Sequence, residues 1–115
     1  MGASDLATNL SPNGTSSTST TPTFTWTDPT GASSYTYQFF ISDNNGNTLW
    51  QIPGQNSSSS GFDSSITSIT WGTDPTDASN TPSVGSLTSG TTYSWQIQVQ
   101  DSAGNQAQTQ VNYTP

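Results

Sequence analysis

The chain contains no lysine, arginine, histidine, cysteine or glutamate, and each absence removes a class of function. Without lysine or arginine it cannot displace counterions from a nucleic-acid backbone or bind anionic lipid headgroups. Without basic residues and thiols it cannot form a Ser-His-Asp triad, a Cys-His pair or a Schiff base. Disulfides and thiolate metal sites are excluded as well. We therefore expect no enzymatic activity, no cofactor and no nucleic-acid partner.

Long hydrophobic runs are also missing. No segment approaches the roughly 20 apolar residues of a membrane-spanning helix, so membrane insertion is not expected. Hydrophobic residues make up only 27% of the 115 residues. Disordered chains, however, are poor in aromatic and β-branched residues, whereas this one has four Trp, four Tyr and four Phe besides abundant threonine. The composition favours a folded all-β domain with a thin core rich in aromatics.

Short segments that alternate apolar and polar residues, separated by Asn, Gly and Pro, predict an antiparallel β-sandwich. The seven expected strands are 7–10, 23–27, 35–41, 49–52, 66–71, 93–100 and 106–113. In the strongest of them Tyr93, Trp95, Ile97 and Val99 are predicted to face inward. The aperiodic stretch 72–85 is expected to be an ordered surface loop. We predict one domain over residues 1–115, with 1–5 as linker residues or a remnant of cloning.

Part of this pattern resembles a known family. The segment Leu87-x-x-Gly90-Thr91-Thr92-Tyr93-x-Trp95-x-Ile97-x-Val99-x-Asp101-x-x-Gly104-Asn105 is similar to the last third of a fibronectin type III domain of the bacterial secreted kind. Pro22-x-Phe24-x-Trp26 resembles the second strand of that family with its core tryptophan, and Gly31-Ala32-x-x-Tyr35-x-Tyr37 resembles the third.

The resemblance implies a seven-stranded immunoglobulin-like sandwich. It also implies a tyrosine corner, in which Leu87 precedes Tyr93 by six residues and the phenol of Tyr93 bonds to the loop backbone. Trp26 and Trp95 are then structural core residues. Relatives often carry arginine where Gln96 stands, so the resemblance does not imply binding by charge.

The candidate binding residues are aromatics that the strand pattern does not place in the core. Phe40 is out of phase with Tyr37 and Phe39, so it is expected on the outer face of its strand. That face also carries the amides Gln38, Gln96 and Gln98, with Gln108 and Gln110 beside them. Aromatic rings among amides suit carbohydrate, because the ring stacks on a pyranose while the amides bond its hydroxyls. Alternatively, Phe40 packs under a loop or against a neighbouring domain.

Two further tryptophans, Trp50 and Trp71, are predicted to lie at strand ends beside polar loops, which makes them candidates for the same role. For a cation, the best pair is Asp74 and Asp77, which form only a weak candidate for calcium. The loop 43–47 lacks the glycine and glutamate spacing of an EF-hand and is predicted to be a hairpin turn, as is 101–105.

These observations favour a non-catalytic module of a larger secreted or cell-surface bacterial protein, acting in spacing, adhesion or display. Its ends, 9–21 and 112–115, are rich in Ser, Thr and Pro and resemble joints in a tandem array. The expected partners are neighbouring domains of the same polypeptide, and polysaccharide or another surface protein. The alternatives are a carbohydrate-binding domain that uses Phe40, Trp50 or Trp71, and an engineered scaffold from which basic residues were removed.

Overall fold

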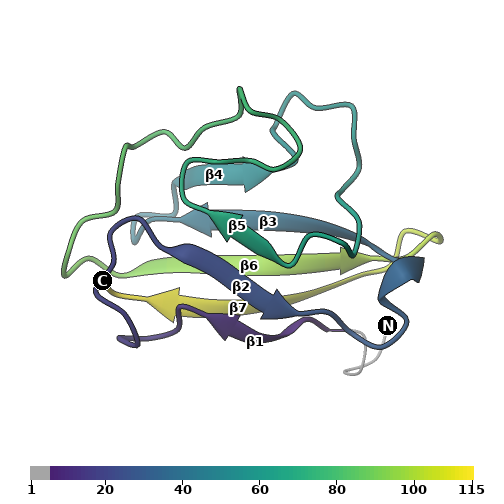
Figure 1. The fold of residues 1–115 in the computed structure, drawn as a ribbon, viewed down its shortest axis with the longest axis horizontal. Helices are drawn as coiled ribbons and strands as arrows, with labels where there is room; N and C mark the ends of the chain where they lie inside the picture. The colour runs from purple at the N-terminus through teal and green to yellow at the C-terminus, as the bar shows by residue number, and fades with distance from the viewer. Residues whose placement is uncertain (1–5) are drawn as a thin grey trace.

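The computed structural model describes residues 6–115, which form two facing antiparallel β-sheets of three and four strands (Figure 1). Residues 1–5, predicted to be a linker or a remnant of cloning, lie outside the described part. The fold is all-β and sandwich-like, as the alternating sequence pattern predicts. The strands are β1 (Thr8–Ser11), β2 (Thr23–Thr27), β3 (Thr36–Ser42), β4 (Thr48–Ile52), β5 (Ser68–Thr70), β6 (Tyr93–Gln100) and β7 (Gln106–Tyr113).

The strand order is β1-β2-β5 in one sheet and β4-β3-β6-β7 in the other. The chain therefore crosses between the sheets after β2, after β4 and after β5. The segment after β1 bonds to the end of β7, because the N–H of Gly14 donates to the carbonyl of Asn112 at 2.6 Å and the carbonyl of Gly14 accepts from Thr114 at 2.8 Å. It therefore connects an edge strand of the three-stranded sheet to an edge strand of the four-stranded sheet.

Aromatic rings fill the space between the sheets. Phe24 of β2 contacts Phe39 of β3 and Trp95 of β6, with ring centroids 5.0 and 4.9 Å apart. The predicted inward set of β6 is confirmed, since every second residue from Tyr93 to Val99 is buried. The core is thin and aromatic because few aliphatic residues are available to fill it.

One predicted strand is shorter than expected. The segment 66–71 contributes only Ser68–Thr70 to the sheet, because a turn at Asp63 still includes Ile66, whose N–H donates to the carbonyl of Asp63. The segment before it holds a core residue that the pattern did not indicate. Phe62 is buried and forms a bridge with Tyr37 of β3. Gly61 permits this close approach, since a Cβ there would lie 2.9 Å from the carbonyl oxygen of Tyr37.

The loop 72–85 covers the free edge of β4, beside which it runs in Figure 1. The N–H of Ser83 donates to the carbonyl of Leu49 at 2.9 Å, and the Asn80 side-chain amide donates to the carbonyl of Gln51 at 2.8 Å. Exposed strand edges invite pairing with other chains, and lysine is a common protection against it. In this lysine-free chain, the loop occupies part of that edge instead.

Candidate functional site

The outer face of the four-stranded sheet carries the amides that the sequence predicted there. Register aligns them in rows across the strands. Phe40 stands opposite Gln51 on one side and Gln96 on the other, and Gln96 stands opposite Gln110. The next row pairs Gln98 with Gln38 and with Gln108. We call this surface the amide face, and it comprises Gln38, Phe40, Gln51, Gln96, Gln98, Gln108 and Gln110.

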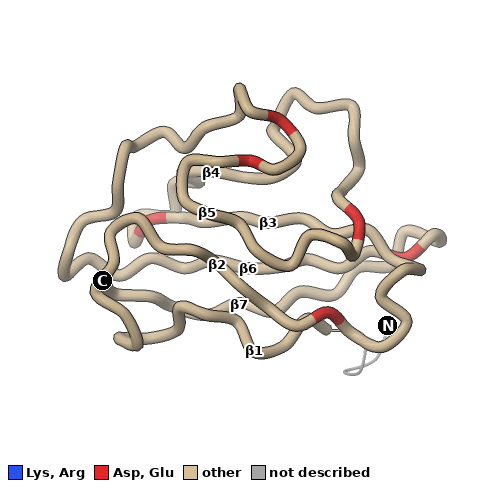
Figure 2. The backbone as a smooth tube through the Cα atoms, in the orientation of Figure 1, with Lys and Arg blue, Asp and Glu red and all other residues tan. Residues whose placement is uncertain are grey.

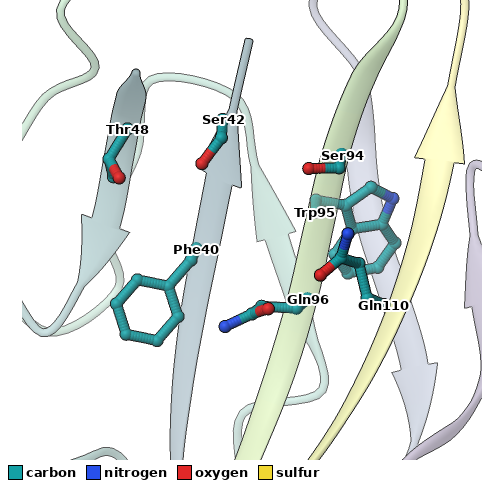
Figure 3. Close-up of a pocket in the computed structure, with 7 residues that line it drawn as sticks. All are labelled: Phe40, Ser42, Thr48, Ser94, Trp95, Gln96 and Gln110. Carbon is teal, nitrogen blue, oxygen red and sulfur yellow. The ribbon is translucent and has the colours of Figure 1, made fainter. Parts of the chain in front are cut away.

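A hollow of about 140 Å³ lies on this face beside Phe40 (Figure 3). Gln96 reaches from β6 toward Phe40, and Gln110 extends from β7. Ser42, Thr48 and Ser94 add hydroxyl groups to the lining, and Trp95 borders the hollow although its indole is packed in the core. Phe40 is half-buried, so part of its ring is available at the surface. The hollow thus combines an aromatic ring with amide and hydroxyl groups and contains no ionisable side chain.

Several of the amides are free to bond a ligand. Gln38 and Gln51 donate to the carbonyls of Ser60 and Pro53 at 3.0 and 3.4 Å. The side chains of Gln96 and Gln110, by contrast, make no hydrogen bond to any residue from 6 to 115. Each primary amide offers two donors and an acceptor. The amide face therefore keeps unused hydrogen-bonding capacity next to the hollow.

The carboxylates of residues 6–115 lie in turns and loops, away from the middle of the sheets (Figure 2). Asp43, in the β3–β4 turn, accepts from the N–H groups of Asn45 and Asn47, both at 2.9 Å. These bonds lower the pKa of Asp43, with the backbone of Asn47 as the main cause. Asp101 makes the same bonds in the β6–β7 turn, and the Asn105 side chain is the first cause of its lowered pKa. Charge is thus confined to the ends of the amide face.

The expectation of surface positions for Trp50 and Trp71 is wrong. Their side chains are 3% and 7% exposed, and their rings contact each other edge-on at 5.6 Å. The indole N–H of Trp50 donates to the carbonyl of Asn80, and that of Trp71 donates to the carbonyl of Gly85. Both acceptors belong to the loop 72–85, which folds over the strand ends and encloses the rings. Of the three candidate aromatics, Phe40 alone stays at the surface.

The weak calcium candidates, Asp74 and Asp77, serve the same loop. Asp74 is buried, and its Oδ1 accepts from the N–H and hydroxyl of Thr76 while its Oδ2 accepts from the amide of Asn80 at 2.8 Å. The exposed Asp77 accepts from Ser79, and this lowers its pKa. Within residues 6–115 no three acidic side chains gather as a metal site. Asn80, which sequence reasoning missed, connects this loop to β4.

Two of the predicted structural residues, Tyr93 and Trp95, form hydrogen bonds to backbone groups outside the strands. The phenol oxygen of Tyr93 accepts from the N–H of Thr88 at 2.8 Å, next to the buried Leu87, so the predicted bond to the loop backbone is confirmed. The indole of Trp95 donates to the carbonyl of Pro12 at 2.9 Å.

The indole of Trp26 donates to Asp28 at 3.1 Å. Burial raises the pKa of Asp28, and this hydrogen bond acts in the opposite direction. The pKa of Asp28 is thus shifted in the direction opposite to those of Asp43, Asp77 and Asp101. Sequence reasoning missed this pair, although the spacing of two residues could have suggested it.

Comparison with known proteins identifies no relative. No protein-family model matches the chain, and no curated protein matches it significantly. No helix in the described part is long and apolar enough to cross a membrane. The functional argument therefore depends on the sandwich and the chemistry of its surfaces.

Proposed function

We propose that the chain is a non-catalytic, fibronectin type III-like module of a larger bacterial protein that is secreted or displayed on the cell surface. Its role there is spacing, adhesion or display. Its partners are the neighbouring domains of the same polypeptide and a surface ligand. The single observation that carries the proposal is the hydrogen bond between Tyr93 and Thr88.

This bond supports the proposal because it matches the tyrosine corner of immunoglobulin-like domains. In such domains a tyrosine near the start of strand F bonds to the backbone a few residues upstream. Tyr93 begins β6, and Thr88 lies five residues before it in the chain. The strand order is compatible, because strands A, B and E of such sandwiches share one sheet and C, F and G the other. Here β1, β2 and β5 lie in one sheet and β3, β6 and β7 in the other.

The positions of the chain ends suit a module in series. Pro115 lies at one end of the long axis, and β1 begins in the other half of that axis (Figure 1). That axis measures 39 Å. The carbonyl of Pro115 accepts from the N–H of Gly90 at 2.9 Å, which holds the C-terminal end against the β5–β6 connection. A module whose first strand and last residue lie in opposite halves of its long axis adds length to a string of domains.

Trypsin treatment of intact cells tests the proposal. The 115 residues contain no lysine or arginine, so trypsin has no cleavage site within them. We expect trypsin to release from the parent protein a fragment that includes the whole chain, detected by mass spectrometry of the medium. A cytoplasmic marker must remain inside the cells as the control. Release of this fragment only after cell lysis would contradict the proposed location.

A further inference from the structure

We propose that the amide face binds an uncharged polysaccharide, with Phe40 against a sugar ring and the glutamines bonding its hydroxyl groups. This inference rests on the extracellular role proposed above, since such a role brings the domain into contact with polysaccharide. It assigns the ligand class and the residues, and it leaves the buried Trp50 and Trp71 out of the site.

Phe40 supplies the apolar contact. Its half-buried ring lies between Gln51 and Gln96 in the register and beside the hollow. The face of an aromatic ring is electron-rich, whereas the C–H groups of a pyranose carry partial positive charge. If a sugar ring covered Phe40, the hydroxyl groups around the rim of the sugar would lie over the surrounding amides.

The amides supply the polar contacts. Gln96 and Gln110 line the hollow and have no bond to another described side chain or backbone group. Amides and sugar hydroxyls both donate and accept, so each can satisfy the other without a charge. Neighbouring strands are about 4.8 Å apart, and the rows therefore repeat hydrogen-bonding groups at short, regular intervals. A polymer of repeating sugar units matches such a surface better than a single small molecule does.

The electrostatics select an uncharged ligand. The amide face has no cation to bind a carboxylate, sulfate or phosphate, and the whole chain carries a charge of −7. An anionic polysaccharide would meet net repulsion, which salt screens only partly at short range. The carboxylates nearest the face, Asp43 and Asp101, are already bonded within their own turns. Binding should therefore depend little on salt concentration.

A protein partner fits this surface less well. The cores of protein interfaces are rich in apolar and aromatic side chains. The amide face offers one such ring, and a protein that covered it would bury many amides that each need a partner. Hydroxyl groups on every sugar unit supply those partners.

Affinity electrophoresis tests the inference, because the negative charge drives the native protein through a gel at pH 8. We expect at least one of a panel of neutral polysaccharides to retard the protein: hydroxyethylcellulose, xyloglucan, galactomannan and soluble starch. Polygalacturonate is the anionic comparison and should not retard it. Failure of every neutral polymer to retard the protein would overturn the inference, as would equal retardation by polygalacturonate.

Variants locate the site. Phe40→Ala should weaken association at least about tenfold, and Gln96→Ala about fivefold. The matched control is Val84→Ala, which removes the one strongly exposed large hydrophobic side chain found in the described chain, on the loop 72–85. Its binding should equal that of the unmodified protein. Thermal unfolding of each variant separates loss of binding from loss of the fold.

Phe40→Trp provides a direct readout. The larger ring preserves stacking, so binding should persist. The fluorescence emission of the new tryptophan should shift on binding, and it can be followed because the four native tryptophans are buried. Unchanged binding by Phe40→Ala would overturn the inference. So would a dimer in sedimentation that Phe40→Ala dissociates, since this would assign the face to a second copy. These measurements on purified protein are independent of the trypsin experiment, so the two proposals fail separately.

Discussion

Asp43 and Asp101 begin two turns with the same set of hydrogen bonds. In each turn Oδ1 accepts two backbone N–H groups and Oδ2 accepts from the side chain of the asparagine four residues later. A glycine with positive φ, Gly46 or Gly104, precedes that asparagine. Only a short side chain reaches N–H groups so close in sequence. Aspartate is therefore used here to build turns, which accounts for a chain that has aspartate and no glutamate.

Tyr93→Phe tests the hydrogen bond between Tyr93 and Thr88 that supports the proposed domain type. The change removes the acceptor of the Thr88 N–H and leaves the ring in place, so we expect a loss of about 1–2 kcal/mol in the free energy of unfolding. Urea denaturation measures it. The control is Thr25→Val, an exposed position of β2 with no side-chain hydrogen bond to other described residues, which should change stability by less than about 0.5 kcal/mol. If Tyr93→Phe also changed the free energy of unfolding by less than about 0.5 kcal/mol, the hydrogen bond to Thr88 would not stabilise the fold as we expect.

The loop 72–85 shows how an element without periodic structure can complete a fold. It lies on the free edge of β4 and encloses Trp50 and Trp71, which donate to its carbonyls. Asp74 holds the loop together from inside by accepting from Thr76 and Asn80. The loop is itself at the surface, as predicted, with Asp74 as its one buried residue, and it acts as a cover for two rings of the core.

Asp74→Ala should open this loop. Its buried carboxylate accepts several hydrogen bonds, so we expect a loss of about 2–3 kcal/mol in the free energy of unfolding. The fluorescence emission should shift to the red, because Trp50 and Trp71 would meet water. Asp77→Ala is the matched control, since Asp77 is exposed and its carboxylate bonds only Ser79 among the described residues. Equal effects of the two substitutions would contradict the assignment.

Calcium distinguishes this structural role from a metal site. Both oxygens of Asp74 are occupied by the loop itself. Addition of CaCl₂ or EDTA should leave the Tm of the unmodified protein unchanged. A rise in Tm that saturates with calcium would show that Asp74 and Asp77 bind the ion.

The charge of the whole molecule comes from aspartate alone, and this sets how its stability depends on pH. Hydrogen bonds in turns lower the pKa of Asp43, Asp63, Asp77 and Asp101 below 3.8. Near and below pH 3.8 the unfolded chain binds more protons than the folded one, so the free energy of unfolding decreases as the pH is lowered. Burial raises the pKa of Asp28, which has the opposite effect and is outnumbered. The pKa of Tyr37 is raised, mainly by burial and to a smaller extent by the electrostatic effects of Asp28 and Tyr35.

Thermal unfolding across pH checks these signs. We expect a constant Tm from about pH 5.5 to 9, because no side chain titrates there. It should fall below about pH 4 as the turn aspartates protonate, and above about pH 10, where the unfolded chain loses the Tyr37 proton before the folded one does. Replacing Asp43 and Asp101 by asparagine should weaken the acid transition. A marked change of Tm between pH 6 and 8 would contradict this account.

Local pattern was sufficient for β6, where alternation predicted both the strand and its buried face. It was also sufficient for the two Asp-x-x-Gly-Asn turns, whose hydrogen bonds join residues at most four apart. It failed for Trp50 and Trp71, because the groups that bury them are far away in the chain. The Trp50 indole bonds Asn80, thirty residues later, and no local feature indicates that contact.

For the candidate site, too, one part could be predicted from the sequence and another part depends on the tertiary structure. The phase of the strand was enough to place Phe40 outward among glutamines. The pairing of Phe40 with Gln96 and of Gln96 with Gln110 depends on the register between strands. The turns and the packed rings of the core hold that register.

The amino-acid sequence alone determined the all-β class, the inward set of β6, the turns built on aspartate and the exclusion of binding by positive charge. These depend on composition and on residues close together in the chain. The tertiary structure alone decided that Phe40 remains at the surface while Trp50 and Trp71 are enclosed. Burial depends on which segments cover a ring, and the carbonyl groups that the two indoles bond lie 30 and 14 residues further along the chain.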